Sequence, residues 1–492
     1  MSALREQVRD ALFLFPAGLA RLGLVDREKG EEAFDLAIPV MVTGGMRTLL
    51  RVADFFMVSL ALGPAAVAAL EFGFQYYFIP FGLALALTSG TISVVSRFKG
   101  AEQDAEAAFA VKQSLWLSLM LSIPITVGTW LYAQPLIDLL TDDTRAIELG
   151  AIYLKIIMLS VAFRFWGMIA ARALQGAGDT RTPMYIRLIT LPTNIALNAV
   201  LIFGLGPFPR LGIAGAAWGT AIANVLAAVI FFVVLGSGRY AIRLPIRGKQ
   251  WDTDIAGEIV RVGLPLAGTR LAQTFGRFPF LFLLALLGTD IVAAYAIGRR
   301  VILLALMPAW GYSTASSTLV GQSIGAGDEE EADAYGWQTL RIALITQLLI
   351  AAVLIAGAGP IAAAFGAQNH DLTVQFIQMF GLGVAGFSIS RTLRGGLRGA
   401  GDTRWPFYGT MAGTYLVRLP IAALALPAGM AITVFDYSFA PGLGFGLLAV
   451  YVAIVADFYV RAGVNFVRFR SGRWKAVARA SGIGDDESAR TD

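Results

Sequence analysis

Two sets of polar residues interrupt apolar stretches of the chain, and each could do chemistry there. In the first half, Asp54 lies within the apolar stretch 36–62, and Asn194 and Asn198 lie within 182–204. Residues four positions apart share a face of an α-helix, so the two amides can point to one place. A charged side chain costs free energy inside such a stretch and is a functional candidate by default. Asp54 is therefore the first residue to explain.

Arg51 stands one helical turn before Asp54, and two interpretations of this spacing stay open. An Arg51–Asp54 ion pair that only fixes the helix would keep the carboxylate ionised. Alternatively, Asp54 is a carboxylate whose occupancy by a cation changes during a functional cycle. For Asn194 and Asn198 the alternative is polar contact between neighbouring helices. Glu71 is either a solvated cleft residue or a second coupling acid.

The second half carries an excess of arginine inside its apolar stretches. Its main acid is Asp457, which has Arg461 four residues later. This imbalance predicts a positive potential, which suits an anionic or zwitterionic substrate or the phosphates of lipids. The residues that we expect to line a substrate cleft are Arg51, Glu71, Arg270, Gln273, Arg277 and Arg391.

The composition indicates a chain that lives in a lipid bilayer. Of its 492 residues, 57% are hydrophobic and 15% are charged, whereas soluble proteins are about 45–50% apolar and about 25% charged. There is no cysteine, and His370 is the single histidine. Disulfides and cysteine-based metal sites are thus excluded, and the net charge of +5 is read as a topology signal rather than as a sign of nucleic-acid binding.

Apolar runs long enough to cross a bilayer recur along the whole chain. They predict an all-α integral membrane protein of about twelve transmembrane helices in two six-helix lobes. The expected organisation is an amphipathic N-terminal segment 1–35, a first lobe 36–238, a linker 239–256, a second lobe 257–466 and a tail 467–492. The predicted spans are 36–62, 67–96, 112–140, 147–171, 182–204, 211–237, 257–288, 291–324, 337–366, 371–397, 404–431 and 443–466.

Basic residues gather in alternate loops, which predicts the orientation of the chain. Arg97 and Lys99 follow the second span, and a basic group of Arg239, Arg243 and Arg247 lies in the linker. The opposite loops are nearly free of Lys and Arg. By the positive-inside rule both termini are cytoplasmic in a multi-pass plasma membrane protein. We expect residues 1–35 to lie on the inner membrane surface.

A duplication relates the two halves. The segment LQGAGDTRTPMY begins at residue 174, and LRGAGDTRWPFY begins 223 residues later, at 397, with nine of twelve positions identical. Each repeat holds six spans, an even number, so both halves enter the membrane from the same side. We therefore expect a pseudo-two-fold axis along the membrane normal. The repeated segment itself predicts a tight cytoplasmic turn, with Asp179 or Asp402 capping the next helix.

The pattern L-x-G-A-G-D-T-R-x-P after the fourth span of each half resembles the MATE (multidrug and toxic compound extrusion) family. The first span, LLRVADFFMVSLALGPAAVAAL, the fifth, NIALNAVLIFG, and the sixth, GIAGAAWGTAIAN, are similar to the corresponding family helices. The resemblance covers roughly residues 36–466. It is to the archaeal and DinF-like branch, within the MOP flippase superfamily.

This resemblance implies an antiporter that exports small organic molecules in exchange for Na⁺ or H⁺ by alternating access. Matched residue by residue, the family's coupling site falls on Asp54, Asn194, Asn198 and Thr220, with Asn198 where a second Asp is frequent. Oxygen ligands from Asp54, Asn194 and Thr220 suit Na⁺, and protonation of Asp54 is the alternative. No further cofactor is expected, and we expect a monomer whose partners are the substrate and the bilayer.

Other functions are weighed against this one. A lipid-linked precursor flippase of the same superfamily is favoured by the arginines, because pyrophosphate groups need them, but such flippases often have more than twelve spans. The loop RFKGAEQDAEAA lacks the basic motif of major-facilitator transporters. No enzyme motif, channel-filter loop or ATP-binding P-loop pattern is present, so neither an enzyme nor a primary pump is expected.

Overall fold

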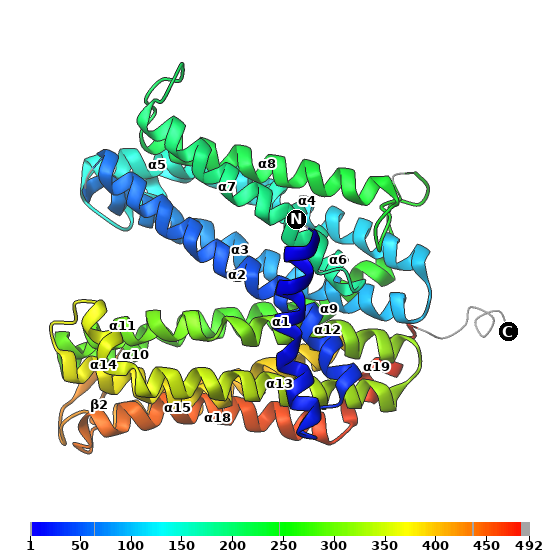
Figure 1. Cartoon of the computed structure of the whole chain (residues 1–492). Helices are drawn as coiled ribbons and strands as arrows, with labels where there is room; N and C mark the ends of the chain where they lie inside the picture. The colour runs from blue at the N-terminus through cyan, green and yellow to red at the C-terminus, as the bar shows by residue number, and fades with distance from the viewer. Residues whose placement is uncertain (1, 63, 246, 435–436, 484–492) are drawn as a thin grey trace. The chain divides into compact units, whose positions relative to one another are not determined.

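The computed structural model describes residues 2–62, 64–245, 247–434 and 437–483. Almost all of them are helical, which confirms the predicted all-α class. The helices of the first half are α1 (Ser2–Arg21), α2 (Arg27–Leu62), α3 (Pro64–Gly100), α4 (Asp104–Asp138), α5 (Thr144–Leu159), α6 (Val161–Gly176), α7 (Arg181–Phe203) and α8 (Ile213–Ser237) (Figure 1).

The second half repeats this order with more interruptions. Its helices are α9 (Thr253–Phe275), α10 (Arg277–Leu287), α11 (Thr289–Ala305), α12 (Met307–Gly325), α13 (Glu329–Ala356), α14 (Ala358–Ala364), α15 (His370–Gly399), α16 (Arg404–Met411), the π-helix η1 (Ala412–Arg418), α17 (Leu419–Ala423), α18 (Gly446–Arg470) and α19 (Arg473–Arg479). A short antiparallel hairpin of β1 (Ile432–Val434) and β2 (Tyr437–Phe439) lies in the loop before α18.

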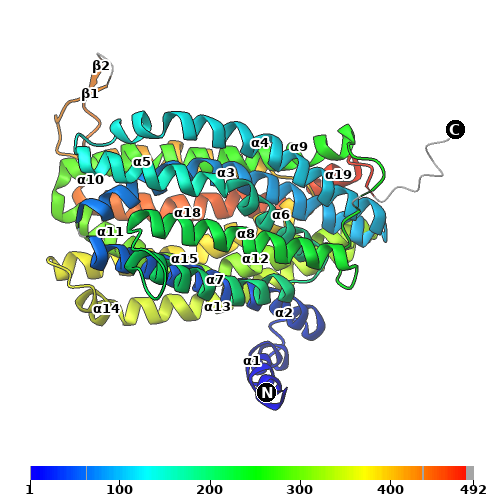
Figure 2. The same ribbon diagram turned by 90° about the horizontal axis from the view of Figure 1, so that it is seen from above.

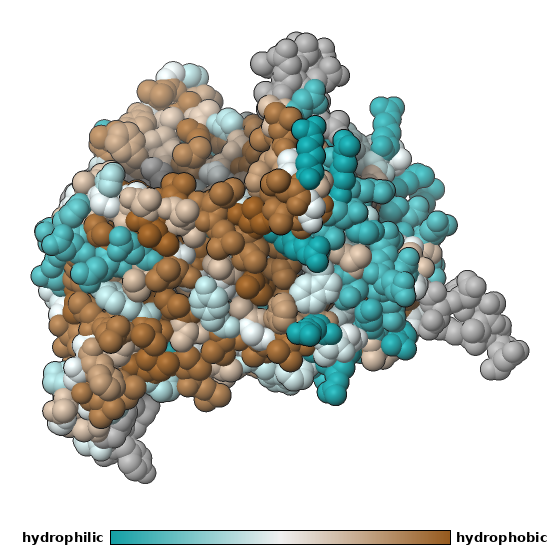
Figure 3. All heavy atoms as spheres, turned by 60° about the horizontal axis from the view of Figure 1, so that its bottom comes forward, coloured by the Kyte–Doolittle hydropathy of each residue, from teal (hydrophilic) through white to brown (hydrophobic). Residues whose placement is uncertain are grey.

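The helices have the length and apolarity that a bilayer requires. Within the described ranges, nine helices can each cross a membrane, and two bent pairs, α5 with α6 and α11 with α12, count as one span each. The predicted span 404–431 corresponds to α16, η1 and α17, where a π-helix interrupts the run. Large apolar side chains such as Leu131, Val353 and Leu416 are 67%, 69% and 75% exposed, as expected for surfaces that face lipid. Figure 3 shows hydrophobic side chains over much of one face.

Contacts within the chain divide it into two compact units. The N-terminal unit is Pro39–Ala267, and the C-terminal unit is Gly268–Gly482 together with Met1–Ile38. Both divisions fall inside a helix, α2 or α9, and close to a proline, Pro39 or Pro265. Proline removes a helical hydrogen bond, so each helix changes unit where its backbone is weakest. This division differs from the predicted boundaries at 36 and 257, because the start of α9 packs with the first half.

The start of each of these two helices is fixed to its unit by polar contacts. In the N-terminal unit, the fully buried Arg97 of α3 donates to Glu258 of α9 and forms an ion pair with it, at 2.8 Å. In the C-terminal unit, Lys29 of α2 pairs with Glu331 of α13 at 3.2 Å. This second ion pair is more exposed to solvent than the pair of Arg97 with Glu258. Figure 2 shows α1 nearly end-on beside the start of α2, and Phe13 of α1 contacts Phe34 of α2 edge to face.

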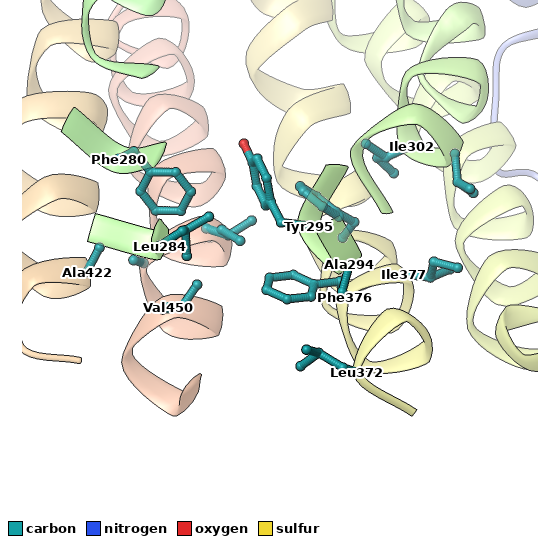
Figure 4. Close-up of a cluster of buried hydrophobic side chains, with 14 of the residues drawn as sticks. Phe280, Leu284, Ala294, Tyr295, Ile302, Leu372, Phe376, Ile377, Ala422 and Val450 are labelled. Atoms are coloured by element: carbon teal, nitrogen blue, oxygen red, sulfur yellow. The ribbon is translucent and has the colours of Figure 1, made fainter. Parts of the chain in front are cut away.

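Each unit has its own hydrophobic core. The core of the C-terminal unit places Phe280, Tyr295 and Phe376 in edge and tilted ring contacts between α10, α11 and α15 (Figure 4). Aromatic pairs of this kind add to the free energy gained by burial alone. The core thereby fixes the helices that carry the polar groups described below.

The duplicated sequence folds into the same turn twice. Ala177 and Ala400 end their helices, Gly178 and Gly401 follow with φ of 89° and 85°, and the next amide in each returns to a carbonyl five residues earlier at 2.8 Å. Left-handed φ favours glycine, which explains the repeated Gly. The aspartates then differ: Asp179 accepts from Thr182 N as predicted for a cap, whereas Asp402 pairs with Arg468 at 2.6 Å.

Candidate functional site

Inside the N-terminal unit Asp54 contacts one amide, and that amide contacts a second one. Asn198 of α7 donates from Nδ2 to Asp54 Oδ1 of α2 at 2.7 Å, and from the same nitrogen to Asn194 Oδ1 at 2.8 Å. Asn198 is 0% exposed and Asn194 is 4% exposed, while Asp54 is half-buried. The structure therefore brings together three of the four predicted coupling residues, because one turn of α7 aligns both amides toward α2.

The other side of the Asn198 amide is an oxygen without a partner. Asn198 Oδ1 is buried and accepts no hydrogen bond among the described residues. Turning the amide over would face this oxygen to the oxygens of Asp54 and Asn194, so the observed orientation is the favourable one. Gly219 of α8 leaves the room for Oδ1, since a Cβ there would lie 2.0 Å from it. Thr220, the fourth predicted residue, follows Gly219 and is half-buried.

A carboxylate, two amide oxygens and a nearby hydroxyl are chemically suited to Na⁺ or to a proton. Among the described residues no group of three or more His, Cys, Asp and Glu could hold a metal ion, so a cation here would rely on neutral oxygens beside one carboxylate. An unpaired buried acceptor costs free energy, and a bound cation would satisfy it. The side chain of Arg51 lies outside the described residues, so its pairing with Asp54 stays a prediction.

The C-terminal unit holds its own buried carboxylate, which we did not include among the predicted site residues. Asp457 of α18 is 2% exposed and accepts from Arg461 at 2.6 Å and from Arg418 at 3.5 Å. Thr414 of η1 accepts from Arg461 at 2.8 Å. The π-helix explains this convergence, because its wider turns carry Thr414 and Arg418 toward α18. The four-residue spacing of Asp457 and Arg461 was the only signal in the sequence.

The predicted cleft residues separate into two groups. Arg270 of α9 and Arg391 of α15 come together on the indole of Trp310, at 5.7 Å and 4.6 Å from the ring centroid. Gln273, three residues after Arg270, is half-buried, whereas Arg277 is exposed. Arg277 is the first residue of α10, whereas Arg270 lies in α9, which ends at Phe275.

Two further polar residues of the N-terminal unit are Glu71, which the sequence predicted, and Arg164, which it did not. Glu71, predicted to line the cleft, is exposed on α3. Arg164 of α6 stacks on Tyr77 and Phe81 at 5.6 Å and 5.5 Å and contacts Asn224 Oδ1 at 3.5 Å. The signal for Arg164 in the sequence is a charged residue inside the apolar stretch 147–171. The N-terminal unit thus also contains a half-buried arginine.

Two units of membrane-spanning helices with polar groups held inside them define a polytopic transporter. The sequence profile of the MatE family matches residues 39–200 and 265–424. The probable multidrug resistance protein NorM of Thermotoga maritima is 26% identical over 453 residues, which are 91% of this chain and 94% of that protein. The FAD transporter of Shewanella oneidensis is 25% identical over 359 residues, which are 72% of this chain and 78% of that protein.

A solved structure is also similar. The crystal structure of MATE in the bent conformation has a TM-score of 0.82 and 23% identity, and the match covers 92% of this chain and 97% of that chain. This chain belongs to the MATE family. It is therefore a multi-pass membrane transporter and not an enzyme, and the predictions of family and of a two-lobed helical fold are confirmed.

Proposed function

We propose that this chain is a secondary active antiporter that exports small organic molecules across the plasma membrane in exchange for Na⁺ or H⁺ by alternating access. It acts as a monomer with both termini in the cytoplasm. The observation that carries the proposal is the partly buried hydrogen bond of Asp54 with Asn198, 2.7 Å long, which joins α2 to α7. A carboxylate with a neutral partner can take up and release a cation.

Occupancy of Asp54 would change this contact between two helices. A proton on the carboxylate removes negative charge and weakens the charge-assisted hydrogen bond from Asn198. Na⁺ instead attracts the amide oxygen, so Asn198 would have to turn. In both cases the bound and free states differ in how α2 and α7 are joined, which is the differential interaction that any ligand needs to shift a conformational equilibrium.

A second candidate is an exporter of anionic metabolites or a flippase for lipid-linked precursors. The arginines on Trp310 favour it, and so does the relative named an FAD transporter, because FAD carries phosphate. The relative named a multidrug resistance protein supports export of small organic molecules more generally. Both candidates use the same coupling site.

The test is transport by the Asp54→Asn variant in proteoliposomes, with Na⁺ and H⁺ gradients imposed separately. The wild type should export a fluorescent substrate under at least one gradient, and that gradient identifies the coupling ion. Asp54→Asn should fall to the rate of protein-free liposomes, because an amide neither binds a proton nor supplies a negative charge.

The matched control is Asp142→Asn, which removes an exposed carboxylate of the same unit and should leave export unchanged. Export by Asp54→Asn at the wild-type rate under both gradients would refute Asp54 as the coupling group. Wild-type export that ignores both gradients would refute antiport itself.

A further inference from the structure

Two arginines lie against one tryptophan inside the C-terminal unit, and a third arginine follows one of them along the same helix. Arg270 of α9 and Arg391 of α15 lie 5.7 Å and 4.6 Å from the ring centroid of Trp310 in α12. Arg394 follows Arg391 on the same face of α15 and is within electrostatic reach of Arg270. All three arginines are half-buried. We name Arg270, Trp310, Arg391 and Arg394 the arginine–tryptophan cluster.

The cluster has positive charge without a matching acid. In the part of the chain that the structure describes, no ion pair joins these three arginines to a carboxylate, and Arg391 Nε is buried without a hydrogen-bond partner. Asp457, a buried acid of the same unit, is already shared by Arg418 and Arg461. Uncompensated charges inside a membrane protein are costly and line ligand pathways.

Other arginines of the chain show what a structural arginine looks like here. Arg398, one turn beyond Arg394 on α15, donates to Ser317 Oγ and to Ser313 O at 3.1 Å each. Arg418 stacks on Phe280 at 4.9 Å, yet it also pairs with Asp457. An arginine that packs inside this unit can therefore still have an acceptor. The arginines of the cluster differ from Arg398 and Arg418 because they lack one among the described residues.

The shape of the guanidinium group indicates which acceptor would suit the cluster. A guanidinium presents a planar fork of donors that matches phosphate or carboxylate oxygens. Arginines from two helices, α9 and α15, can contact separate oxygens of one phosphate. Trp310 is 38% exposed, so the cluster is not sealed by protein. Its indole holds two guanidinium groups by cation–π contact and so preorganises them.

We propose that the arginine–tryptophan cluster binds the phosphate group of an organic anion. The proposal deepens the antiport function, because it names a substrate class for the same transporter. The phosphate can belong to a soluble metabolite or to a lipid headgroup, and the chemistry of recognition is shared. Binding neutralises the arginines and satisfies the orphan donor of Arg391.

The test uses two probes that share one ring system and differ by one phosphate, riboflavin 5′-phosphate and riboflavin. Binding to the full-length protein in phosphatidylcholine nanodiscs is followed by flavin fluorescence. Riboflavin 5′-phosphate should bind at least about tenfold more tightly, as one charge-assisted contact implies. Arg391→Gln and Arg394→Gln should each remove most of this preference and leave riboflavin binding unchanged.

Arg300→Gln is the matched control, since Arg300 is an exposed arginine of the same unit outside the cluster, and it should keep the preference. Arg391→Lys keeps the charge but not the fork, so partial loss is expected even if Arg391→Gln folds poorly. Equal affinity of the wild type for both probes, or an unchanged preference in Arg391→Gln and Arg391→Lys, would overturn the proposal.

Nanodiscs with added phosphatidylglycerol distinguish the two sources of phosphate. Competition with riboflavin 5′-phosphate assigns the site to lipid headgroups, and unchanged binding assigns it to soluble anions. The Asp54→Asn variant separates this proposal from the antiport function. It should lose ion-driven transport and keep probe binding, so the failure of one does not conceal the failure of the other.

Discussion

Asp54 of the N-terminal unit and Asp457 of the C-terminal unit are carboxylates held inside spans of a duplicated fold, and their partners differ in kind. Asp54 accepts from the amide of Asn198 at 2.7 Å. Asp457 accepts from the guanidinium groups of Arg461 and Arg418 at 2.6 Å and 3.5 Å. An amide therefore contacts one carboxylate, whereas two guanidinium groups contact the other.

This difference indicates that the two carboxylates have different roles. Arginine stays protonated in proteins, so Asp457 is permanently neutralised and has little to gain from a cation. Asp54 retains an amide partner whose oxygen, on the far side, is buried and unsatisfied. We interpret the first as a structural pair and the second as an exchangeable site.

The largest effect expected from this comparison is on stability. Asp457→Asn removes the counter-charge of two half-buried arginines, and breaking a buried pair in this way costs about 3–5 kcal/mol. Asp54→Asn replaces a carboxylate beside amides by another amide and should cost less than about 1 kcal/mol. The free energy of unfolding, measured in detergent by tryptophan fluorescence, checks both values.

The outcome that would break the comparison is equal destabilisation by the two substitutions. Asp54 would then be a structural ion pair like Asp457, as the Arg51 interpretation holds. The double variant Asp457→Asn with Arg418→Gln should recover part of the lost stability, because it removes one unpaired charge. That recovery separates a charge effect from a general packing defect.

A smaller effect comes from a glycine beside each polar site. A Cβ at Gly219 would lie 2.0 Å from Asn198 Oδ1, and a Cβ at Gly413 would lie 2.5 Å from Asp457 Oδ1. Alanine at either position must displace the polar group, and overpacking of this kind costs about 1–3 kcal/mol. Gly219→Ala should also raise the ion concentration for half-maximal transport, whereas Gly413→Ala should only lower stability.

Gly236→Ala on α8 and Gly463→Ala on α18 are matched controls, since a Cβ at each has no heavy atom within 4 Å. Both should transport and unfold like the wild type. A change of ion dependence in Gly413→Ala as large as in Gly219→Ala would show that the two units share the coupling function.

Much of this arrangement could be predicted from the sequence because membrane physics acts on composition and periodicity. The apolar runs predicted the spans, and the repeated GAGDTR segment predicted the duplication. The four-residue spacing of Asn194 and Asn198 predicted that both amides face one place, and they do. These signals are local, so a single sequence is sufficient to read them.

The parts that were missed depend on contacts between helices or on irregular backbone. Asp457 gains Arg418 and Thr414 through a π-helix, whose widened turns leave no periodic signal. The sequence does not show that Arg394 lies within electrostatic reach of Arg270, because the two residues are on different helices. The start of α9 belongs to the N-terminal unit because Glu258 meets Arg97, which are 161 positions apart.

The smallest expected effect concerns how the first candidate membrane-spanning helix of each half, α2 or α9, begins. Asp26 caps α2 by accepting from Lys29 N at 2.9 Å, and Asp252 caps α9 by accepting from Asp254 N and Ile255 N at 2.9 Å and 3.1 Å. Asp252 also pairs with Lys249, and this hydrogen bond, followed by that from Ile255 N, lowers the pKa of Asp252. Asp252→Ala should cost about 0.5–2 kcal/mol near pH 6, and Asp26→Ala a similar amount.

The lowered pKa gives the Asp252 cap a defined pH dependence. A carboxylate whose pKa is lower in the folded protein contributes stability that is complete above its ordinary pKa of about 4. That contribution disappears as the pH falls through the lowered value, because the folded state must then take up the proton. The difference between the melting temperatures of wild type and Asp252→Ala should therefore be constant above about pH 5 and should shrink over the interval from about pH 4 downward. A constant difference over that interval would mean that the charge of Asp252 contributes nothing, and that a neutral acceptor would hold the start of α9 equally well.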